Sequence, residues 1–196
     1  MSSKSVVLTG LLIALGSAAL QGAAEEHPVV IIETNLGNLK AELYPDRAPL
    51  AVSNFLQYAE EGFYEGTIFH RVRKGVLVQG GGFTPALQQK KPREAIRNEA
   101  QNRVKNEQWT LAAARSGGIH TATAQFFVNT NDNPQFDHKG MSHSKFGYAV
   151  FGKIIEGIEV VQTIEGLKTT KRGGMRDVPT IPVIIKSVRR DDSAEP

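Results

Sequence analysis

The residues of this chain that could do chemistry gather in two short stretches, Thr67–Thr84 and Thr123–Asn129. The first stretch carries Arg71 and Gln79 among alternating apolar residues, and the second carries Gln125 beside two phenylalanines. Together they supply a guanidinium, amide groups and apolar surfaces, but no nucleophile. Such a set is poorly suited to breaking bonds. It is well suited to holding a proline and weakening the double-bond character of its peptide bond.

Rotation about an X-Pro bond is slow because it breaks amide resonance, at a cost of ~18–20 kcal/mol. In the twisted transition state the proline nitrogen becomes pyramidal and gains a lone pair. A guanidinium beside that nitrogen stabilises the twisted form more than the planar one, which is the kind of binding that raises a rate. Arginine suits this role because it stays charged and presents a fixed fork of donors. From the strand pattern alone, Arg71 could equally be a surface arginine in an ion pair.

The composition is typical of a single globular domain. The chain has 196 residues, of which 40% are hydrophobic and 22% charged, so it can bury a sizeable core. The net charge of +3, with both signs interspersed, is too mild to indicate binding to nucleic acid. The chain has no cysteine, which excludes disulfides, thiolate metal ligands and cysteine nucleophiles.

The first residues have the three-part pattern of a secretory signal peptide. Lys4 gives a positive start, Val6–Leu20 is mostly apolar, and Gly22–Ala24 supplies small residues. We expect cleavage after Ala24, so that residues 1–24 are a signal peptide and the mature protein is periplasmic or secreted. The alternative is a retained membrane anchor, which the pattern disfavours because the run is shorter than the ~20 residues of a spanning helix.

The remaining chain alternates short apolar runs with turn residues and predicts many strands but only two helices. Apolar residues at helical spacing predict helices over Ala48–Glu61 and Glu156–Glu165. Runs rich in β-branched and aromatic residues predict strands at Val29–Thr34, Leu39–Leu43, Trp109–Ala114, Gln125–Asn129, Tyr148–Ile154 and Pro182–Val188, and two more within Ile68–Val78. Lys168–Asp177 is interpreted as a basic loop. Many short strands with two helices favour an all-β barrel, although they do not give its strand count.

Two features could indicate a bound ligand, and neither pattern is complete. The Gly80–Gly82 run could cradle a phosphate, but no nucleotide-binding motif surrounds it and no clear helix follows. A close approach of backbones at a bend is the favoured interpretation. His138 and His143 lie near Asp132 and Asp137, but without the spacing of a zinc site. We therefore expect no metal and no cofactor.

Four motifs in order resemble the cyclophilin-type peptidyl-prolyl cis-trans isomerases, above all the short bacterial, periplasmic members. The motifs are Phe69–Arg71, Gln79–Gly81, Gln125–Phe127 and Phe146–Gly152. The resemblance extends over nearly all of residues 29–189. It implies a closed eight-stranded antiparallel β-barrel capped by two α-helices, with residues 25–190 as the isomerase domain and 191–196 as a flexible tail.

The resemblance also implies a role for each site residue. Arg71 would stabilise the twisted amide, and Gln79 and Gln125 would hold the substrate backbone and position the arginine. The proline pocket would be formed by Val76, Leu77, Phe127, Phe136 and Tyr148, with Phe127 as its floor, and Ala114 and Arg115 would contact the substrate backbone. Without the motifs, plain core packing would be the better interpretation of each aromatic residue. His70 is a motif residue with a structural role.

Three positions depart from the usual family pattern. Val76 stands where most members have phenylalanine, Lys74-Gly75 replaces a Pro-Gly turn, and Arg115 replaces the asparagine of eukaryotic members. The valine widens the pocket and removes an aromatic wall, which bears on the catalytic rate more than on the fold.

The predicted function is therefore acceleration of X-Pro isomerisation in exported polypeptides during their folding. The partners would be proline-containing unfolded or flexible polypeptides. We expect a monomer that binds no nucleic acid and, after cleavage, no membrane. One alternative is a binding module with the same fold but little turnover. Another is an interaction protein that uses the basic segment Lys168–Arg176.

The resemblance finally implies weak binding of the cyclic peptide cyclosporin. Members that bind it tightly resemble one another in a tryptophan on the loop before the strand of Phe151. Gln135 falls at that position, and the chain's single tryptophan, Trp109, lies elsewhere.

Overall fold

The computed structural model describes residues 27–191 and 193, and the predicted signal peptide, residues 1–24, lies outside them. Within this part of the chain, eight antiparallel strands form one sheet in the order β10-β1-β2-β7-β5-β6-β4-β3. The strands are β1 (Val29–Thr34), β2 (Gly37–Leu43), β3 (Ile68–Arg73), β4 (Leu77–Phe83), β5 (Thr110–Ala113), β6 (Phe126–Asn129), β7 (Val150–Glu156) and β10 (Ile185–Arg190). The predicted fold class, mainly β with two helices, is confirmed.

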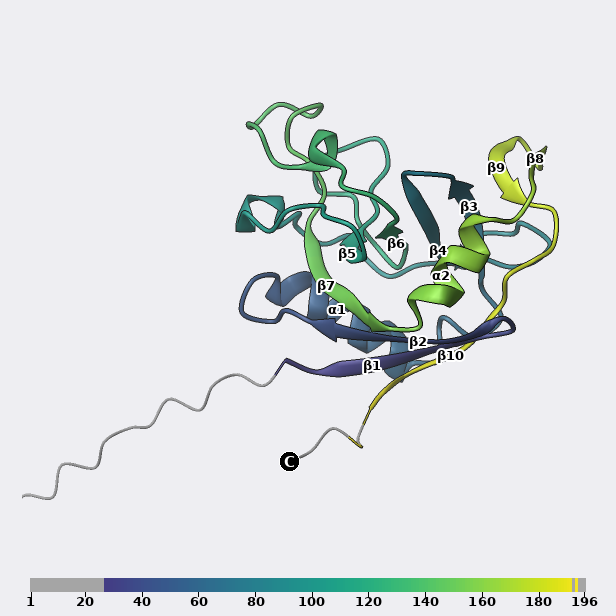
Figure 1. The fold of residues 1–196 in the computed structure, drawn as a ribbon. Coiled ribbons are helices and arrows are strands. Elements are labelled where there is room, and N and C mark those ends of the chain that lie inside the picture. The colour runs from purple at the N-terminus through teal and green to yellow at the C-terminus, as the bar shows by residue number, and fades with distance from the viewer. Residues whose placement is uncertain (1–26, 192, 194–196) are drawn as a thin grey trace, which may run out of the picture.

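The sheet is an open, strongly curled half-barrel, so the predicted closed barrel is wrong (Figure 1). Its edge strands β3 and β10 are not joined by a ladder. They are connected by the isolated bridge between Ile68 and Ile184 and by a few backbone hydrogen bonds, such as the one from the Phe69 N–H to the Val183 carbonyl at 2.9 Å. Pro182, just before this segment, has no N–H to donate, which works against a regular ladder there.

Two helices pack against different parts of the curled sheet. Helix α1 (Pro49–Glu60) packs against β7 and β10, and helix α2 (Ile158–Glu165) packs against β2, β3 and β4. The start of α1 has no capping side chain of its own. The carboxylate of Glu99 accepts hydrogen bonds from the N–H groups of Leu50 and Ala51 instead. No helix in the described residues is long and apolar enough to cross a membrane.

The core is organised around one side chain of α1. The Phe55 ring lies 5.2–5.4 Å from the rings of Tyr64, Phe126 and Phe151. Phe126 also meets Phe69 of β3 edge to face at 5.9 Å. These contacts bring β3 and β6, the strands of the two main motifs, to one rigid aromatic cluster.

The structure differs from the sequence-based expectations in several element boundaries. The predicted basic loop Lys168–Asp177 is largely a hairpin of β8 (Thr169–Arg172) and β9 (Met175–Pro179), which lies against β3. Figure 1 shows this hairpin at the upper right, beside β3 and the end of α2. The strand expected from Trp109 starts one residue later, because Trp109 adopts a φ of 69° that no regular strand has. The final strand runs over Ile185–Arg190 rather than Pro182–Val188.

Candidate active site

Arg71 on β3, Gln79 on β4 and Gln125 just before β6 form a row of polar side chains connected by hydrogen bonds. Arg71 on β3 is paired with Gln79 on β4, and its Nη1 donates to Gln79 Oε1 at 3.3 Å. The Nε2 of Gln79 then donates to Oε1 of Gln125, just before β6, at 3.0 Å. All three side chains are half-buried. This row fixes the direction of the Arg71 guanidinium while leaving most of its donors available.

The glycine run makes room for this row and for the core beneath it. A Cβ on Gly82 would stand 2.5 Å from Cγ of Gln125. A Cβ on Gly81 would stand 2.9 Å from the rings of Phe126 and Tyr64, and Gly81 also has a φ of 82°. At Gly81 and Gly82 the close neighbours are thus side chains, which larger residues would displace. The expected close approach of backbones is seen at Gly80, where a Cβ would stand 3.1 Å from the carbonyl oxygen of Ile68.

Beside the polar row lies a pocket of about 320 Å³ with both polar and apolar lining residues. Its lining includes Arg71, Leu77, Gln79, Ala114, Arg115, Phe127, Phe136 and Tyr148. Phe127 is buried beneath it, and the rings of Phe127, Phe136 and Tyr148 meet pairwise at centroid distances of 5.2–5.7 Å, each pair edge to face. The pocket therefore combines an aromatic floor and walls with three guanidiniums in its lining, those of Arg71, Arg73 and Arg115.

Eight of the ten predicted site residues line this pocket, and the other two lie next to it. Val76 packs, half-buried, against the cluster of Leu77, Ala114 and Phe127 without lining the pocket. Gln125 contacts the pocket indirectly, through Gln79.

Arg115 has a role in this structure that its sequence position did not indicate. Its guanidinium donates to the carbonyls of Gly118, His143 and Gly147 at 3.0–3.1 Å, and its Cζ lies 4.8 Å from the centre of the Tyr148 ring. The side chain thus joins two loops and supports one wall of the pocket.

A buried amide network that the sequence analysis missed supports the Phe136 side of the pocket. Asn133 Nδ2 donates to the carbonyl of Val76 and to Oδ1 of Asn129, at 2.8 and 2.9 Å. Asn106 N–H donates to Oδ1 of Asp137 at 2.8 Å. These residues flank Phe136 on both sides, so they fix the short turn that presents its ring. In the sequence, Asn131–Pro134 is a typical turn cluster, and nothing in it indicates these contacts with distant residues.

A second cluster near Arg71 was also missed. Asp177, on β9, places Oδ2 3.9 Å from Nε of Arg71, and Arg73 follows two residues along β3. Nothing in the sequence places Asp177 beside Arg71, because the two residues are 106 positions apart and were assigned to a strand and a loop.

His70 is buried behind Arg71, with 4% of its surface exposed. Burial lowers the pKa of its ring from 6.5 to about 4, a hydrogen bond to the backbone of Ile68 opposes the shift, and the charge of Arg71 adds to it. Its ring packs against Phe83 at 4.6 Å. His70 is thus neutral near pH 7 and fills space beneath the site.

The two histidines considered as metal ligands both have protein partners. His138 Nδ1 lies 2.8 Å from the carbonyl of Phe146, and His143 Nε2 lies 3.1 Å from Arg115. Among the described residues, no group of three or more His, Asp or Glu side chains could hold a metal ion.

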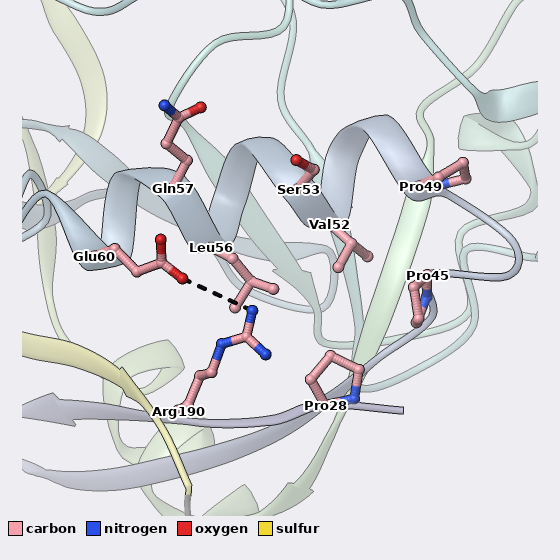
Figure 2. A pocket seen from close by; sticks show the side chains of 9 residues that line it. All are labelled: Pro28, Pro45, Pro49, Val52, Ser53, Leu56, Gln57, Glu60 and Arg190. Atoms are coloured by element: carbon pink, nitrogen blue, oxygen red, sulfur yellow. Dashed lines mark ion pairs between the residues drawn. The ribbon is translucent and has the colours of Figure 1, made fainter. Parts of the chain in front are cut away.

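A groove of about 750 Å³ lies elsewhere, between α1 and the strands β1 and β10 (Figure 2). Pro28, Pro45 and Pro49 line one end of it, and Arg190 and Glu60 form an ion pair of 3.7 Å across it. It shares no residue with the pocket beside Arg71, and its only charged side chains neutralise each other. Its chemistry therefore offers no second candidate for catalysis.

Known proteins resemble this chain over most of its length. The family model described as "Cyclophilin type peptidyl-prolyl cis-trans isomerase/CLD" matches residues 29–190. The chain is 47% identical over 160 residues to peptidyl-prolyl cis-trans isomerase B of Escherichia coli, covering 82% of this chain and 98% of that protein. It is 40% identical over 185 residues to peptidyl-prolyl cis-trans isomerase A of Dickeya dadantii, covering 94% and 95%.

The fold has solved counterparts as well. A crystal structure of a cyclophilin-type isomerase of Cryptosporidium parvum superposes with a TM-score of 0.72 at 30% identity, covering 87% of this chain and 99% of that one. The same protein solved in the presence of the dipeptide Ala-Pro gives a TM-score of 0.71. The chain belongs to the cyclophilin-type peptidyl-prolyl cis-trans isomerases. The predicted enzyme class is thereby confirmed.

Proposed function

We propose that the pocket beside Arg71 receives the proline of a flexible polypeptide and that Arg71 accelerates rotation of its X-Pro bond. The observation that carries this proposal is the row Arg71–Gln79–Gln125 at the rim of an aromatic pocket. The apolar floor holds the proline ring. The guanidinium then faces the nitrogen that gains a lone pair as the amide twists, so it favours the transition state over the planar ground state.

Each neighbouring group has a part in this mechanism. Gln79 accepts a hydrogen bond from Arg71 and thereby holds the fork of donors in one orientation. Gln125 accepts from Gln79 and keeps its own amide N–H groups for the substrate backbone. No proton is transferred and no covalent bond forms, which fits a row without a nucleophile or a general base.

The direct test is the rate of cis-trans exchange in a short X-Pro peptide, measured by magnetisation transfer with and without the protein. We expect exchange far faster than the tens to hundreds of seconds of the uncatalysed reaction. Binding of the peptide without faster exchange would instead support the second candidate, a binding module. The observation that favours that candidate is Val76, which packs against the cluster of Leu77, Ala114 and Phe127 beside the pocket and supplies no aromatic ring there.

We further propose that the enzyme acts on exported polypeptides after removal of residues 1–24. The support is the Lys4, Val6–Leu20 and Gly22–Ala24 pattern. Mass spectrometry of the protein recovered from the exporting cell should find a mature chain that begins at Glu25. A membrane-bound form that still carries Met1 would contradict this proposal and favour a retained anchor.

Cyclosporin should bind at least tenfold more weakly than it does to a relative with tryptophan at the position of Gln135. Gln135 lies exposed on the short turn Pro134–Phe136 and donates to Oδ1 of Asn133 at 2.7 Å, so it offers no indole N–H and little apolar area. A lost hydrogen bond costs ~0.5–1.5 kcal/mol, and lost apolar contact adds ~25 cal/mol per Å². Together these terms account for a tenfold loss or more.

Calorimetric titration of the natural protein and of Gln135→Trp checks this expectation. The substituted protein should regain part of the affinity, while Gln101→Trp, an exposed control away from the pocket, should gain none. Nanomolar binding by the natural protein, or no gain from Gln135→Trp, would contradict this description of the pocket.

A further inference from the structure

A second hollow, of about 740 Å³, adjoins the proline pocket on the side of the β8–β9 hairpin. The two hollows share Arg71 and Arg73 in their linings, so they are parts of one continuous surface. The lining of the second hollow consists of His70, Arg71, Arg73, Phe83, Gln89, Ser116, Gln125, Met175, Arg176 and Asp177. We call this hollow the hairpin recess.

The hairpin recess is strongly cationic. It contains three arginines and one carboxylate, and that carboxylate, Asp177, already lies 3.9 Å from Arg71. His70 adds no charge near pH 7, because burial lowers its pKa to about 4. Among the described residues, neither Arg73 nor Arg176 lies within 4.0 Å of a carboxylate oxygen. Within the described part of the chain, two guanidiniums beside the site therefore have no carboxylate partner.

The hairpin brings Arg176 and Asp177 to this place through an irregular ladder. The pairing of β8 with β9 shifts register between Thr170 and Arg172, and Asp177 opposite this shift has a φ of 62°. Asp is one of the few residue types that adopt this conformation readily. The hairpin thus departs from a regular ribbon at the two residues that face β3 across the recess.

We propose that the hairpin recess binds an aspartate or glutamate side chain of the polypeptide substrate, close in sequence to the proline held beside Arg71. A guanidinium offers a fixed fork of donors that matches a carboxylate, and two of them are available here. Half-buried Met175 and Phe83 provide apolar surface for the methylene groups of the same side chain. This inference rests on the proposed function, because it requires that the proline occupy the neighbouring pocket.

The test compares peptides that differ only in one residue near the proline, with glutamate, glutamine or lysine placed in turn at each position up to three residues on either side. Exchange rates give kcat/KM for each peptide at low salt. At one of these positions we expect the glutamate peptide to exceed the glutamine peptide about three- to tenfold, mainly through KM, as for two partly exposed ion pairs. The lysine peptide should be the weakest, and added salt should reduce the difference.

Substitutions of hairpin and β3 arginines test whether the preference for glutamate over glutamine peptides arises in the hairpin recess. Arg73→Gln combined with Arg176→Gln should bring the ratio of glutamate to glutamine peptides close to one. Arg172→Gln, an exposed hairpin arginine that does not line the recess, should keep the wild-type ratio. Equal rates for glutamate and glutamine peptides at every position, or an equal loss of preference in Arg172→Gln, would overturn the inference. In that case the protein would still accelerate exchange in the glutamine peptide, and the proposed function would be unaffected. A protein that accelerates exchange in none of the peptides would contradict the proposed function itself.

Discussion

Replacement of Arg71 by alanine should lower kcat/KM for an X-Pro peptide by about 10²–10³-fold, the usual effect of removing one electrostatic donor from a transition state. Arg71 is the guanidinium that Gln79 holds at the rim of the aromatic pocket. Because its contribution is larger in the twisted state than in the planar one, most of the loss should appear in kcat. Exchange spectroscopy on one X-Pro peptide measures kcat and KM for the wild type and for Arg71→Ala.

Two controls separate this effect from a general loss of structure. Arg189→Ala removes an exposed arginine from β10, away from the pocket, and should keep the wild-type rate. Arg71→Lys keeps the positive charge but loses the planar fork that Gln79 holds, so its rate should fall between those of the wild type and the alanine variant. An Arg71→Ala protein that folds normally and keeps near wild-type turnover would remove Arg71 from the mechanism.

The protein should lose about 3 kcal/mol of stability between pH 7 and pH 4 through His70 alone. The ring has a pKa of about 4 when folded, against 6.5 when it is exposed. Between these values the unfolded chain binds a proton that the folded chain does not, so the free energy of unfolding falls as the pH falls. The contribution is fully present above pH 6.5 and is lost progressively towards pH 4.

Urea unfolding at a series of pH values measures this slope. His70→Asn removes the titrating ring, so its stability should depend less on pH in this window, even if its absolute stability is lower. Hydrogen bonds to Ser193 and Lys40 lower the pKa of Asp191 to about 2. Asp191 is present in both proteins, so its contribution to the pH dependence of stability cancels in the comparison. The ring of His70 in the wild type should titrate near pH 4 in NMR spectra, and a midpoint near 6.5 would show that burial does not act as argued.

The sequence predicted most of this fold because its strands and helices have clear periodic patterns. The exceptions have physical causes. The residues of β8 are all exposed, so that strand has no alternation of buried and exposed positions to detect. Whether the sheet closes depends on how Ile68 and Ile184, far apart in sequence, meet, and no local pattern shows that they form only an isolated bridge.

The residues that line the pocket were predicted more completely than the residues that hold them in place. Motif residues such as Arg71 and Phe127 lie in runs that can be matched to a family. Asp177 and Asn106 act through contacts across the fold, and each is an ordinary polar residue in its own segment. The same holds for the side chain of Arg115, which donates to the carbonyls of His143 and Gly147 in a loop that only the tertiary structure brings near. The effects of Arg71 and the other site residues on turnover stay predictions.

The pairing of β1 with β10 has a consequence for how the enzyme can be attached to other molecules. Val30 lies opposite Arg190, so the described chain enters and leaves the fold at neighbouring points. Figure 1 shows these points at the bottom of the molecule, while β3 and the β8–β9 hairpin lie at the upper right. A tag, a surface linker or a fused carrier joined at either of these points would therefore leave the proposed proline pocket open. Because these two points are close, a short linker could connect them and make the backbone circular. The circular chain could then be opened at an exposed turn, which gives a circular permutant.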